Sequence, residues 1–154
     1  MIRAYSGGFL DERRLKRIIS SFAEELGSCP DFHNGGWFNL ETYQSFNRKT
    51  DDFIVDVAES LPESLADFRG LAIGVKRSRI NYDLYLCYVA RENRGKGIMA
   101  SLISLLEKKA IQRGCQNLNS VVVPENNVAS LNFHRTRGFT EKKSTGCVEF
   151  TKQL

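Results

Sequence analysis

The chain has 154 residues, of which 42% are hydrophobic and 26% charged, a composition typical of a single globular domain. Its 12 glycines and 3 prolines exclude collagen-like and low-complexity classes, and no apolar run approaches the roughly 18 residues of a membrane-spanning helix. The formal charge of +4 is small and its basic and acidic residues are interleaved, which favours an anionic small molecule over nucleic acid or a membrane as the partner.

The first third of the sequence predicts a short strand, two helices and a loop between the helices. Apolar residues recur every three or four positions from Leu15 to Leu26, which indicates an amphipathic helix that begins at Asp11 and ends before Gly27. Proline, asparagine and two glycines break the segment that follows, and a second, weaker helix is expected after it. The expected elements are a strand at 2–6, helices at 11–26 and 40–49, and a loop at 28–38.

The remaining two thirds predict a run of strands followed by alternating strands and helices. Strands are expected at 53–58, 68–76, 82–90, 118–123, 139–143 and 148–152, and helices at 97–113 and 127–136. The unbroken apolar stretch from Tyr85 to Ala90 indicates a strand that is covered on both faces. This order of elements implies an α/β fold (mixed α+β), in which helices cover both faces of one mixed sheet.

The cysteines and the charged N-terminal segment indicate a cytoplasmic protein without a metal site. Asp, Glu and two Arg occupy positions 11–14, where a secretory leader would be apolar. The four cysteines are far apart in the sequence and show no metal-ligand spacing, so they are expected to be reduced thiols in or near the core. They are Cys29, Cys87, Cys115 and Cys147.

The segment 89–99 is the most informative for function. A buried strand is followed by a turn and a long helix, so several main-chain N–H groups would point outward at the positive end of that helix. Gly95 and Gly97 allow an anion to approach the backbone, and Arg94 and Lys96 add positive charge. The turn predicts a phosphate site, although neither the G-x-G-x-x-G nor the P-loop spacing is met, and the glycines alone are equally typical of a tight turn.

Two motifs in this half of the chain resemble those of a known family. The stretch Arg94-Gly-Lys-Gly-Ile-Met99 resembles the acyl-CoA-binding signature Q/R-x-x-G-x-G/A of the GNAT N-acetyltransferase superfamily. The stretch from Asn127 to Phe139 resembles the second signature of that family, N-x-x-A/S-x-x-F/L-Y/H-x-x-x-G-F. Met99 departs from the family pattern, because it stands where a small residue is preferred.

The resemblance implies one GNAT-like domain over 1–154, with a single, mostly antiparallel sheet whose central strands splay apart. Residues 53–154 would form the acyl-CoA-binding core, and residues 1–52 would form the acceptor side. The implied activity is transfer of an acetyl group from acetyl-CoA to a primary amine of a small molecule, peptide or protein, by direct attack in a ternary complex. The alternative is a non-catalytic module of the same fold that binds coenzyme A or acyl-CoA.

The same resemblance implies a set of cofactor contacts. The main-chain N–H groups of 94–99 would hold the diphosphate of coenzyme A. The pantetheine arm would pair as a false strand between the strand that ends at Val89 and the strand at 118–123, and a main-chain N–H would stabilise the oxyanion. The residues assigned to the cofactor are Cys87, Val89, Arg94, Gly95, Lys96, Gly97, Ile98, Met99, Asn127 and Ser130.

Two residues are candidates for catalysis. His134 fills the position where the family often has a tyrosine general acid, and His134→Phe is then expected to lower kcat with little change in acetyl-CoA affinity. The alternative is a helix histidine without a catalytic task. Asp83 is the first candidate for the general base, although a residue that starts a strand is its simpler interpretation.

Other interpretations of the chain are also testable. A covalent route through Cys87 would give ping-pong kinetics, and a basic nucleic-acid binder would show salt-dependent affinity. The exposed final strand pair is compatible with a homodimer. The sequence does not name the amine acceptor.

Overall fold

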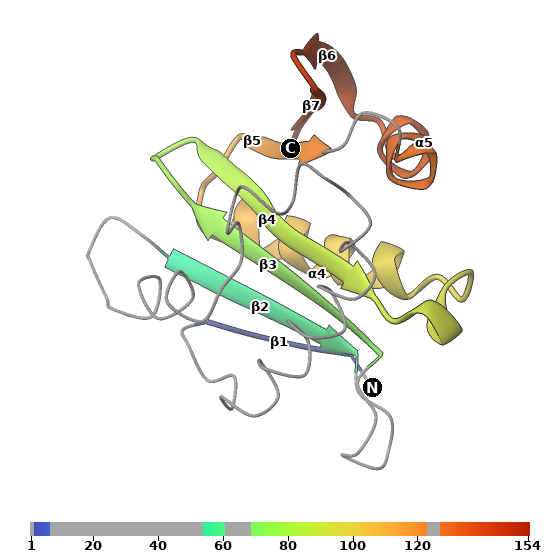
Figure 1. Cartoon of the computed structure of the whole chain (residues 1–154). Coiled ribbons are helices and arrows are strands. Elements are labelled where there is room, and N and C mark those ends of the chain that lie inside the picture. The colour runs from blue at the N-terminus through green and yellow to red at the C-terminus, as the bar shows by residue number, and fades with distance from the viewer. Residues whose placement is uncertain (1, 7–53, 61–68, 123–126) are drawn as a thin grey trace.

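The computed structural model describes residues 2–6, 54–60, 69–122 and 127–154 (Figure 1). The helices and the loop that were predicted between residues 7 and 53 lie outside the described residues, as does Cys29. The elements are β1 (Ile2–Ser6), β2 (Ile54–Ser60), β3 (Gly70–Lys76), β4 (Asn81–Val89), the short 3-10 helix η1 (Arg91–Asn93), α4 (Ile98–Gln112), β5 (Asn117–Val122), α5 (Val128–Thr136), β6 (Thr140–Ser144) and β7 (Cys147–Gln153).

The described strands form one seven-stranded sheet in the order β1-β2-β3-β4-β5-β7-β6. Every neighbouring pair is antiparallel except β4 and β5, which run parallel. The predicted mixed, mostly antiparallel sheet is therefore confirmed. Between β5 and β6 the chain skips one place in the sheet, so that β7 pairs with β5 and β6 becomes an edge strand whose residues are all exposed.

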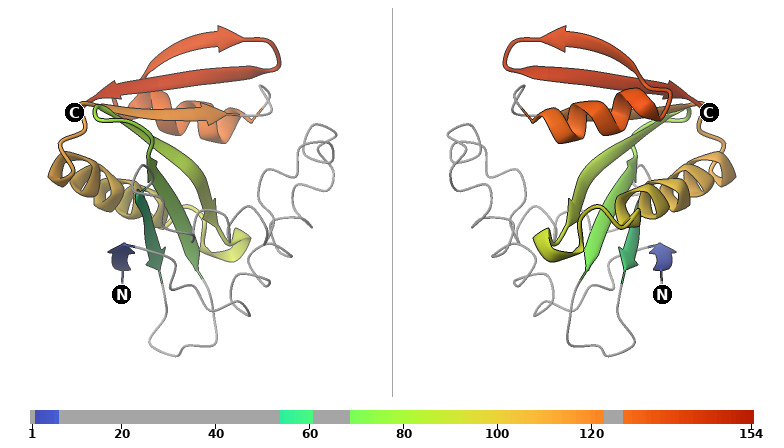
Figure 2. Two further views of the ribbon diagram at one scale, coloured as in Figure 1. Left: turned by 90° about the vertical axis from the view of Figure 1, so that its left-hand side faces the viewer. Right: turned by 90° about the vertical axis from the view of Figure 1, so that its right-hand side faces the viewer.

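The strands β4 and β5 pair along only part of their length. Asn81–Leu84 pairs with Asn117–Ser120, and the pairing ends there, while β5 continues with β7 as its partner. We call this paired part the closed region. The remainder of β4, Tyr85–Val89, together with the turn that follows it as far as Gly97, is called the parted region. Figure 2 shows β5 and β4 diverging from the closed region, which confirms the predicted splay.

A register shift between β3 and β4 lies where the two regions meet. Ile73 pairs with Leu86 but the next residue, Gly74, pairs with Leu84, which leaves Tyr85 as an extra residue in β4. Such a bulge bends its strand and increases the local twist. The bulge therefore turns the end of β4 away from the direction that it has in the closed region.

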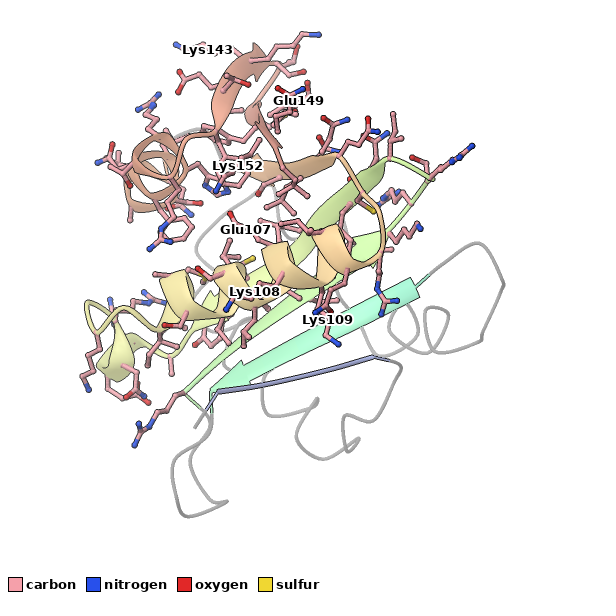
Figure 3. All side chains as sticks on the ribbon, turned by 180° about the vertical axis from the view of Figure 1, so that it is seen from behind. Glu107, Lys108, Lys109, Lys143, Glu149 and Lys152 are labelled. Atoms are coloured by element: carbon pink, nitrogen blue, oxygen red, sulfur yellow. The ribbon has the colours of Figure 1, made fainter. Side chains whose placement is uncertain are left out.

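The helix α4 forms because its apolar residues recur along one face. Leu102, Ile103, Leu106 and Ala110 are buried, and their spacing of one, three and four positions forms a continuous stripe. α4 lies across one face of strands β2–β4 (Figures 1 and 3). The helix was predicted over 97–113, and its observed bounds confirm that prediction.

Two lysine side chains, one from β7 and one from β3, hold α4 against the sheet. Lys152 of β7 forms an ion pair of 2.6 Å with Glu107 (Figure 3), and Lys76 of β3 donates a hydrogen bond of 2.9 Å to the carbonyl of Arg113 at the helix C-terminus. A cation at this position also stabilises the negative end of the helix dipole. α4 is therefore held at its middle and at its C-terminal end, while its N-terminus faces the parted region.

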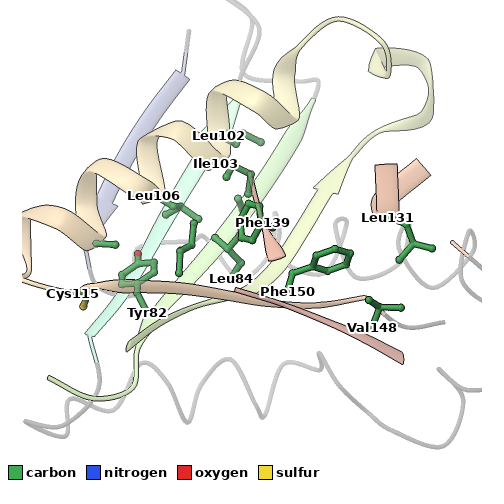
Figure 4. Close-up of a cluster of buried hydrophobic side chains, with 13 residues drawn as sticks. Tyr82, Leu84, Leu102, Ile103, Leu106, Cys115, Leu131, Phe139, Val148 and Phe150 are labelled. Carbon is green, nitrogen blue, oxygen red and sulfur yellow. The ribbon is translucent and has the colours of Figure 1, made fainter. Parts of the chain in front are cut away.

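The core contains aromatic and aliphatic side chains from both helices and from both halves of the sheet (Figure 4). Tyr82 and Phe150 are the largest side chains with almost no exposed surface. A methyl group added to Gly74 would overlap the Tyr82 ring, so β3 requires glycine at this position. Cys87, Cys115 and Cys147 are free thiols. Cys115 lies in this core and Cys87 packs against it, as predicted, and Cys147 is half-buried in β7. Among the described residues, no helix is long and apolar enough to span a membrane.

Candidate cofactor site

The turn between β4 and α4 presents main-chain N–H groups on an open surface. Gly95 and Gly97 adopt φ values of 76° and 75°, which favour glycine because a Cβ would crowd the backbone in this region. The position of a Cβ on either glycine has no atom within 4 Å. An anion can therefore approach the backbone of the turn directly.

The N–H groups at the start of α4 have no acceptor inside the helix. The first intrahelical hydrogen bond is donated by Ser101 to the carbonyl of Gly97, at 3.1 Å. The N–H groups of Ile98, Met99 and Ala100 precede it, and a helix leaves these first donors without partners. The first turn contains no acidic side chain that would neutralise the positive end of the helix dipole. The geometry and chemistry of the turn thus fit a phosphate group.

Two basic side chains donate hydrogen bonds to main-chain carbonyls at the end of β4 and in the turn that follows it. The Nε of Arg94 donates a hydrogen bond of 3.0 Å to the carbonyl of Val89, and its guanidinium lies 5.9 Å from the centroid of the Tyr88 ring. The Nζ of Lys96 donates to the carbonyl of Glu92, at 3.0 Å. The sequence predicted both residues as positive charge beside an anion. In this structure they also fix the shape of the turn from which the glycine amides project.

A groove of about 400 Å³ begins at the first turn of α4. Its lining residues are Ala100, Ser101, Ser104, Leu105, Lys108 and Arg137. The guanidinium of Arg137, which follows α5, lies over the Phe133 ring at 5.1 Å. Sequence reasoning did not single out this groove, although Ser101, Ser104 and Lys108 recur at the spacing of one helix face. The groove extends the site from the amides of the turn toward two cationic side chains.

Asn127 and Ser130 form the start of α5. The side-chain oxygen of Asn127 accepts a hydrogen bond of 3.2 Å from the main-chain N–H of Ser130, which makes Asn127 the N-cap of α5. Asn127 is exposed and Ser130 is half-buried. Both residues stand at the N-terminal end of the helix that packs beside β5 and β7.

His134 is buried between α5 and the sheet. Its Nδ1 lies 2.7 Å from the carbonyl of Ser130, and its Nε2 lies 2.8 Å from the hydroxyl oxygen of Ser120 on β5. The imidazole stacks on the Phe150 ring with centroids 4.5 Å apart, and Phe139 contacts it edge-on. These two hydrogen bonds and two ring contacts fix the orientation of the imidazole.

The partners of His134 determine its protonation. A carbonyl only accepts hydrogen bonds, so Nδ1 carries the proton and Nε2 accepts from the Ser120 hydroxyl. Burial lowers the pKa of His134 below its ordinary value of 6.5, while the hydrogen bond to Ser130 raises it in part. The neutral Nδ1–H form is therefore favoured at neutral pH. A general acid would need a proton on a free nitrogen, and both ring nitrogens are already hydrogen-bonded.

Asp83 lies in the closed region, where its carboxylate has two partners. Arg77 forms an ion pair with one oxygen, and the side-chain amide of Asn119 donates to the other at 3.1 Å. Asp83 lies six positions before Val89, about 20 Å along an extended strand. These contacts correspond to the structural interpretation of Asp83 at the start of a strand.

Cys87 lies in the parted region and packs against the core. Burial raises the pKa of its thiol to about 12, so the thiol remains protonated at neutral pH. The main-chain groups of β4 beside it lie beyond the last pairing with β5. Among the predicted site residues, the structure therefore brings Cys87 and Val89 next to the glycine turn on a strand whose parallel partner has diverged.

The family model of the Acetyltransferase (GNAT) family matches residues 20–139. This match covers most of the chain, and the splayed parallel strands with the glycine turn between β4 and α4 agree with it. The chain belongs to the GNAT acetyltransferase family, whose members use acetyl-CoA. No curated protein matches the sequence of this chain.

Solved structures with the same fold include several N-acetyltransferases. A ribosomal-protein-alanine N-acetyltransferase from Brucella melitensis has a TM-score of 0.71 and 23% identity, with 100% of this chain and 99% of that chain covered. The PaiA N-acetyltransferase from Thermoplasma acidophilum, solved in complex with coenzyme A, has a TM-score of 0.66 and 15% identity, with 100% and 99% covered. An acetyltransferase from Streptococcus agalactiae has a TM-score of 0.72 and 11% identity, with 99% and 98% covered. At these identities the likeness establishes the shared fold.

Proposed function

We propose that this chain transfers the acetyl group of acetyl-CoA to a primary amine while both substrates are bound. The observation that carries the proposal is the row of main-chain N–H groups from Gly95 to Ala100 at the end of the parted region, where the Cβ positions of Gly95 and Gly97 face open space. Backbone amides at a helix N-terminus are a general solution for binding phosphate. In a member of the GNAT family, the corresponding anion is the diphosphate of coenzyme A.

The chain's own residues divide the work of holding this cofactor. The amides of 95–99 hold the diphosphate. The N–H of Arg94, which was predicted to join them, already donates to the carbonyl of Arg91 at 3.2 Å. Lys108 and Arg137 attract the anionic adenosine end along the groove. At Cys87 and Val89, beyond its last pairing with β5, β4 offers main-chain groups to the amides of the pantetheine arm. When bound, acetyl-CoA supplies an activated acetyl thioester.

Direct attack by the amine is favoured over a covalent route through Cys87. A thiolate is the reactive form of cysteine. Because burial raises the pKa of the Cys87 thiol to about 12, almost none of it is thiolate at neutral pH. We therefore propose that the acceptor amine reacts in a ternary complex, and ping-pong kinetics would contradict this order.

The roles of the two candidate catalytic residues follow from their contacts. His134 has a positioning role, because both of its ring nitrogens are hydrogen-bonded, one to the carbonyl of Ser130 and one to the hydroxyl of Ser120. A role as general acid would require its Nε2 to exchange Ser120 for the leaving group. Asp83 maintains the closed region through Arg77 and Asn119, and as general base it would have to leave that ion pair.

A calorimetric titration with coenzyme A, followed by transfer assays on a panel of amines, tests the proposal. The panel contains small amines, polyamines, lysine peptides and a peptide that begins with alanine, because the Brucella neighbour is named for acetylation of a ribosomal-protein alanine. We expect binding of coenzyme A and transfer to at least one class of amine. Binding without any transfer would support the non-catalytic module, and no binding would overturn the proposal.

The exposed edge strand β6 leaves room for a second copy of the chain. We propose a homodimer as a second feature of the functional protein. Sedimentation velocity measures the mass directly, and a monomer at high concentration would contradict this part of the proposal.

A further inference from the structure

Ser120 occupies the point where β5 leaves β4. It pairs with Leu84 at the last position of the closed region, and its hydroxyl lies 2.8 Å from Nε2 of His134 in α5. Ser120 and His134 are the two buried polar side chains among the described residues whose exposure is known. We infer that the Ser120–His134 hydrogen bond positions α5 against the point where β4 and β5 part, and thereby sets how far α5 lies from the parted region, where the cofactor is proposed to bind. This inference rests on the proposed function.

A continuous set of hydrogen bonds connects the point where β4 and β5 part to the start of α5. Ser120 donates to His134, whose Nδ1–H donates to the carbonyl of Ser130 at 2.7 Å. The main-chain N–H of Ser130 in turn donates to the capping side chain of Asn127. The first turn of α5, which carries two of the predicted cofactor contacts, is therefore fixed relative to β5 through one imidazole ring.

The aromatic contacts make this ring a rigid connection. The Phe150 ring stacks on the imidazole at an interplanar angle of 19°, and Phe139 packs edge-on at a centroid distance of 5.0 Å. Because the pair is buried, water is poorly placed to replace a lost hydrogen bond. Removal of the Ser120 hydroxyl would leave Nε2 without a donor, and α5 would have to shift to restore one.

A general-acid role and a positioning role predict different results for the same variants. An acid at position 134 predicts that His134→Phe lowers kcat without changing coenzyme A affinity, and that Ser120→Ala changes neither quantity appreciably. A positioning pair predicts that both variants weaken coenzyme A affinity by a similar factor. It also predicts that the double variant binds coenzyme A no more weakly than either single variant does, because each substitution removes the same hydrogen bond.

The experiment measures the Kd of coenzyme A by calorimetry for Ser120→Ala, His134→Phe and the double variant. We expect each to bind about tenfold more weakly than the wild type, which is the order of effect of one buried hydrogen bond. Ser120→Thr keeps the hydroxyl, and His134→Gln keeps an acceptor that can reach Ser120. We expect both to retain affinity within about threefold of the wild type.

A matched control removes a different hydroxyl, which contacts β5 at Asn119 instead of taking part in the Ser120–His134 pair. Thr151 of β7 donates to the side chain of Asn119 at 3.2 Å, on an exposed part of the sheet. Thr151→Ala should therefore leave the Kd unchanged. If Ser120→Ala does not fold, Ser120→Cys replaces it, because a thiol fills the same space but is a weak donor.

A second readout is independent of the cofactor. The Ser120–His134 pair requires His134 to be neutral with its proton on Nδ1, which long-range ¹H–¹⁵N spectra of the imidazole report directly. The chain has two histidines, so the signals are assigned from His134→Phe. Ser120→Ala should change the Nε2 shift, whereas Thr151→Ala should leave it in place.

The outcomes separate this inference from the proposed function. A folded Ser120→Ala or Ser120→Cys variant with wild-type affinity, in a protein whose wild type binds coenzyme A, would overturn the positioning role alone. An Nε2–H tautomer of His134 at neutral pH would overturn it as well. A wild type that does not bind coenzyme A, but shows the Nδ1–H tautomer, would overturn the proposed function and with it the assignment of this pair to a cofactor site.

Discussion

The strands β4 and β5 are paired in the closed region and have diverged beside the parted region, and the polar groups of the two regions have different partners. In the closed region the side-chain amides of Asn117 and Asn119 donate to Asn81 and Asp83 across the parallel pair, at 3.2 and 3.1 Å. In the parted region the sheet pairing of β4 with β5 ends, and the turn after it presents N–H groups to open space.

This contrast shows how one pair of strands supplies both stability and binding. A polar group that is satisfied inside the sheet stabilises the fold but cannot bind a ligand. A strand edge and a helix N-terminus that lack partners contribute little to stability, but they are ready to bind a ligand. Substitutions in the closed region should therefore change the free energy of unfolding, and substitutions in the parted region should change cofactor affinity.

The largest expected effect is loss of stability from Tyr82→Ala in the closed region. The Tyr82 side chain has no exposed surface and packs against Gly74, so its removal leaves a cavity that the sheet cannot fill. Truncation of a buried aromatic residue typically costs about 3–5 kcal/mol. Urea unfolding measures the loss. Tyr85→Ala, at a half-buried position of the parted region, should cost less, and equal losses would contradict the contrast.

The second prediction compares two glycines with the same backbone conformation. Gly97 and Gly146 have φ values of 75° and 73°, and neither has an atom near the position of its Cβ. Substitution by alanine should therefore cost a similar ~1–2 kcal/mol of stability at both positions. Only Gly97→Ala should also weaken coenzyme A binding, by about tenfold or more, because its methyl group would occupy the space of the anion. Calorimetry measures the affinity for coenzyme A. Equal affinities of the two variants would show that the diphosphate does not bind at Gly97.

The third prediction concerns pH and His134, which contacts Ser120 at the last position of the closed region. Burial lowers the pKa of His134 below 6.5, whereas in the unfolded chain it returns to that value. As pH falls through 6.5, the unfolded chain takes up a proton that the folded chain does not, so the free energy of unfolding decreases. Above this range the group contributes no pH dependence.

Urea unfolding at about pH 7.5 and about pH 5.5 tests this dependence, with His134→Phe as the comparison. The wild type should lose more stability between the two values than the variant does. The pKa of Glu141 is lowered below 4.5, first by its hydrogen bond to Arg135, so this carboxylate affects stability only at lower pH. An identical loss in the wild type and the variant would contradict the buried, neutral histidine.

The smallest expected effect is at the cationic end of the groove. Lys108→Ala should weaken coenzyme A binding by only about 2–5-fold, because an exposed charge contributes little in water. The loss should shrink at high salt and should be absent for dephospho-coenzyme A, if Lys108 faces the 3′-phosphate. Lys143→Ala on the exposed strand β6 is the matched control and should leave the affinity unchanged.

Local sequence patterns were sufficient to predict most elements between residues 53 and 154. The helix predicted over 97–113 is observed to within one residue at each end, and the helix predicted over 127–136 begins one residue later, at Val128. The two family motifs predicted the sheet type and the splay. These features depend on neighbours within a few positions of the chain, or on a pattern that a whole family shares.

The features that were not predicted depend on contacts between distant segments. The point at which β4 and β5 part is set by the register between Leu84 and Ser120, together with the bulge at Tyr85. The partner of His134 lies 14 positions earlier in the chain, and no local pattern indicates that Ser120 points toward it. His134 was predicted to be a general acid because of its position in a family motif. Its hydrogen-bond partners and its burial depend on the folded structure.

Backbone amide spectra recorded during a titration with coenzyme A test the central claim most directly. The account predicts the largest shifts at the N–H groups of Gly95, Gly97 and Ile98, with those of Asn117 and Asn119 in the closed region almost unchanged. Shifts of equal size in both regions, or no shift at the glycine turn at saturating coenzyme A, would contradict it.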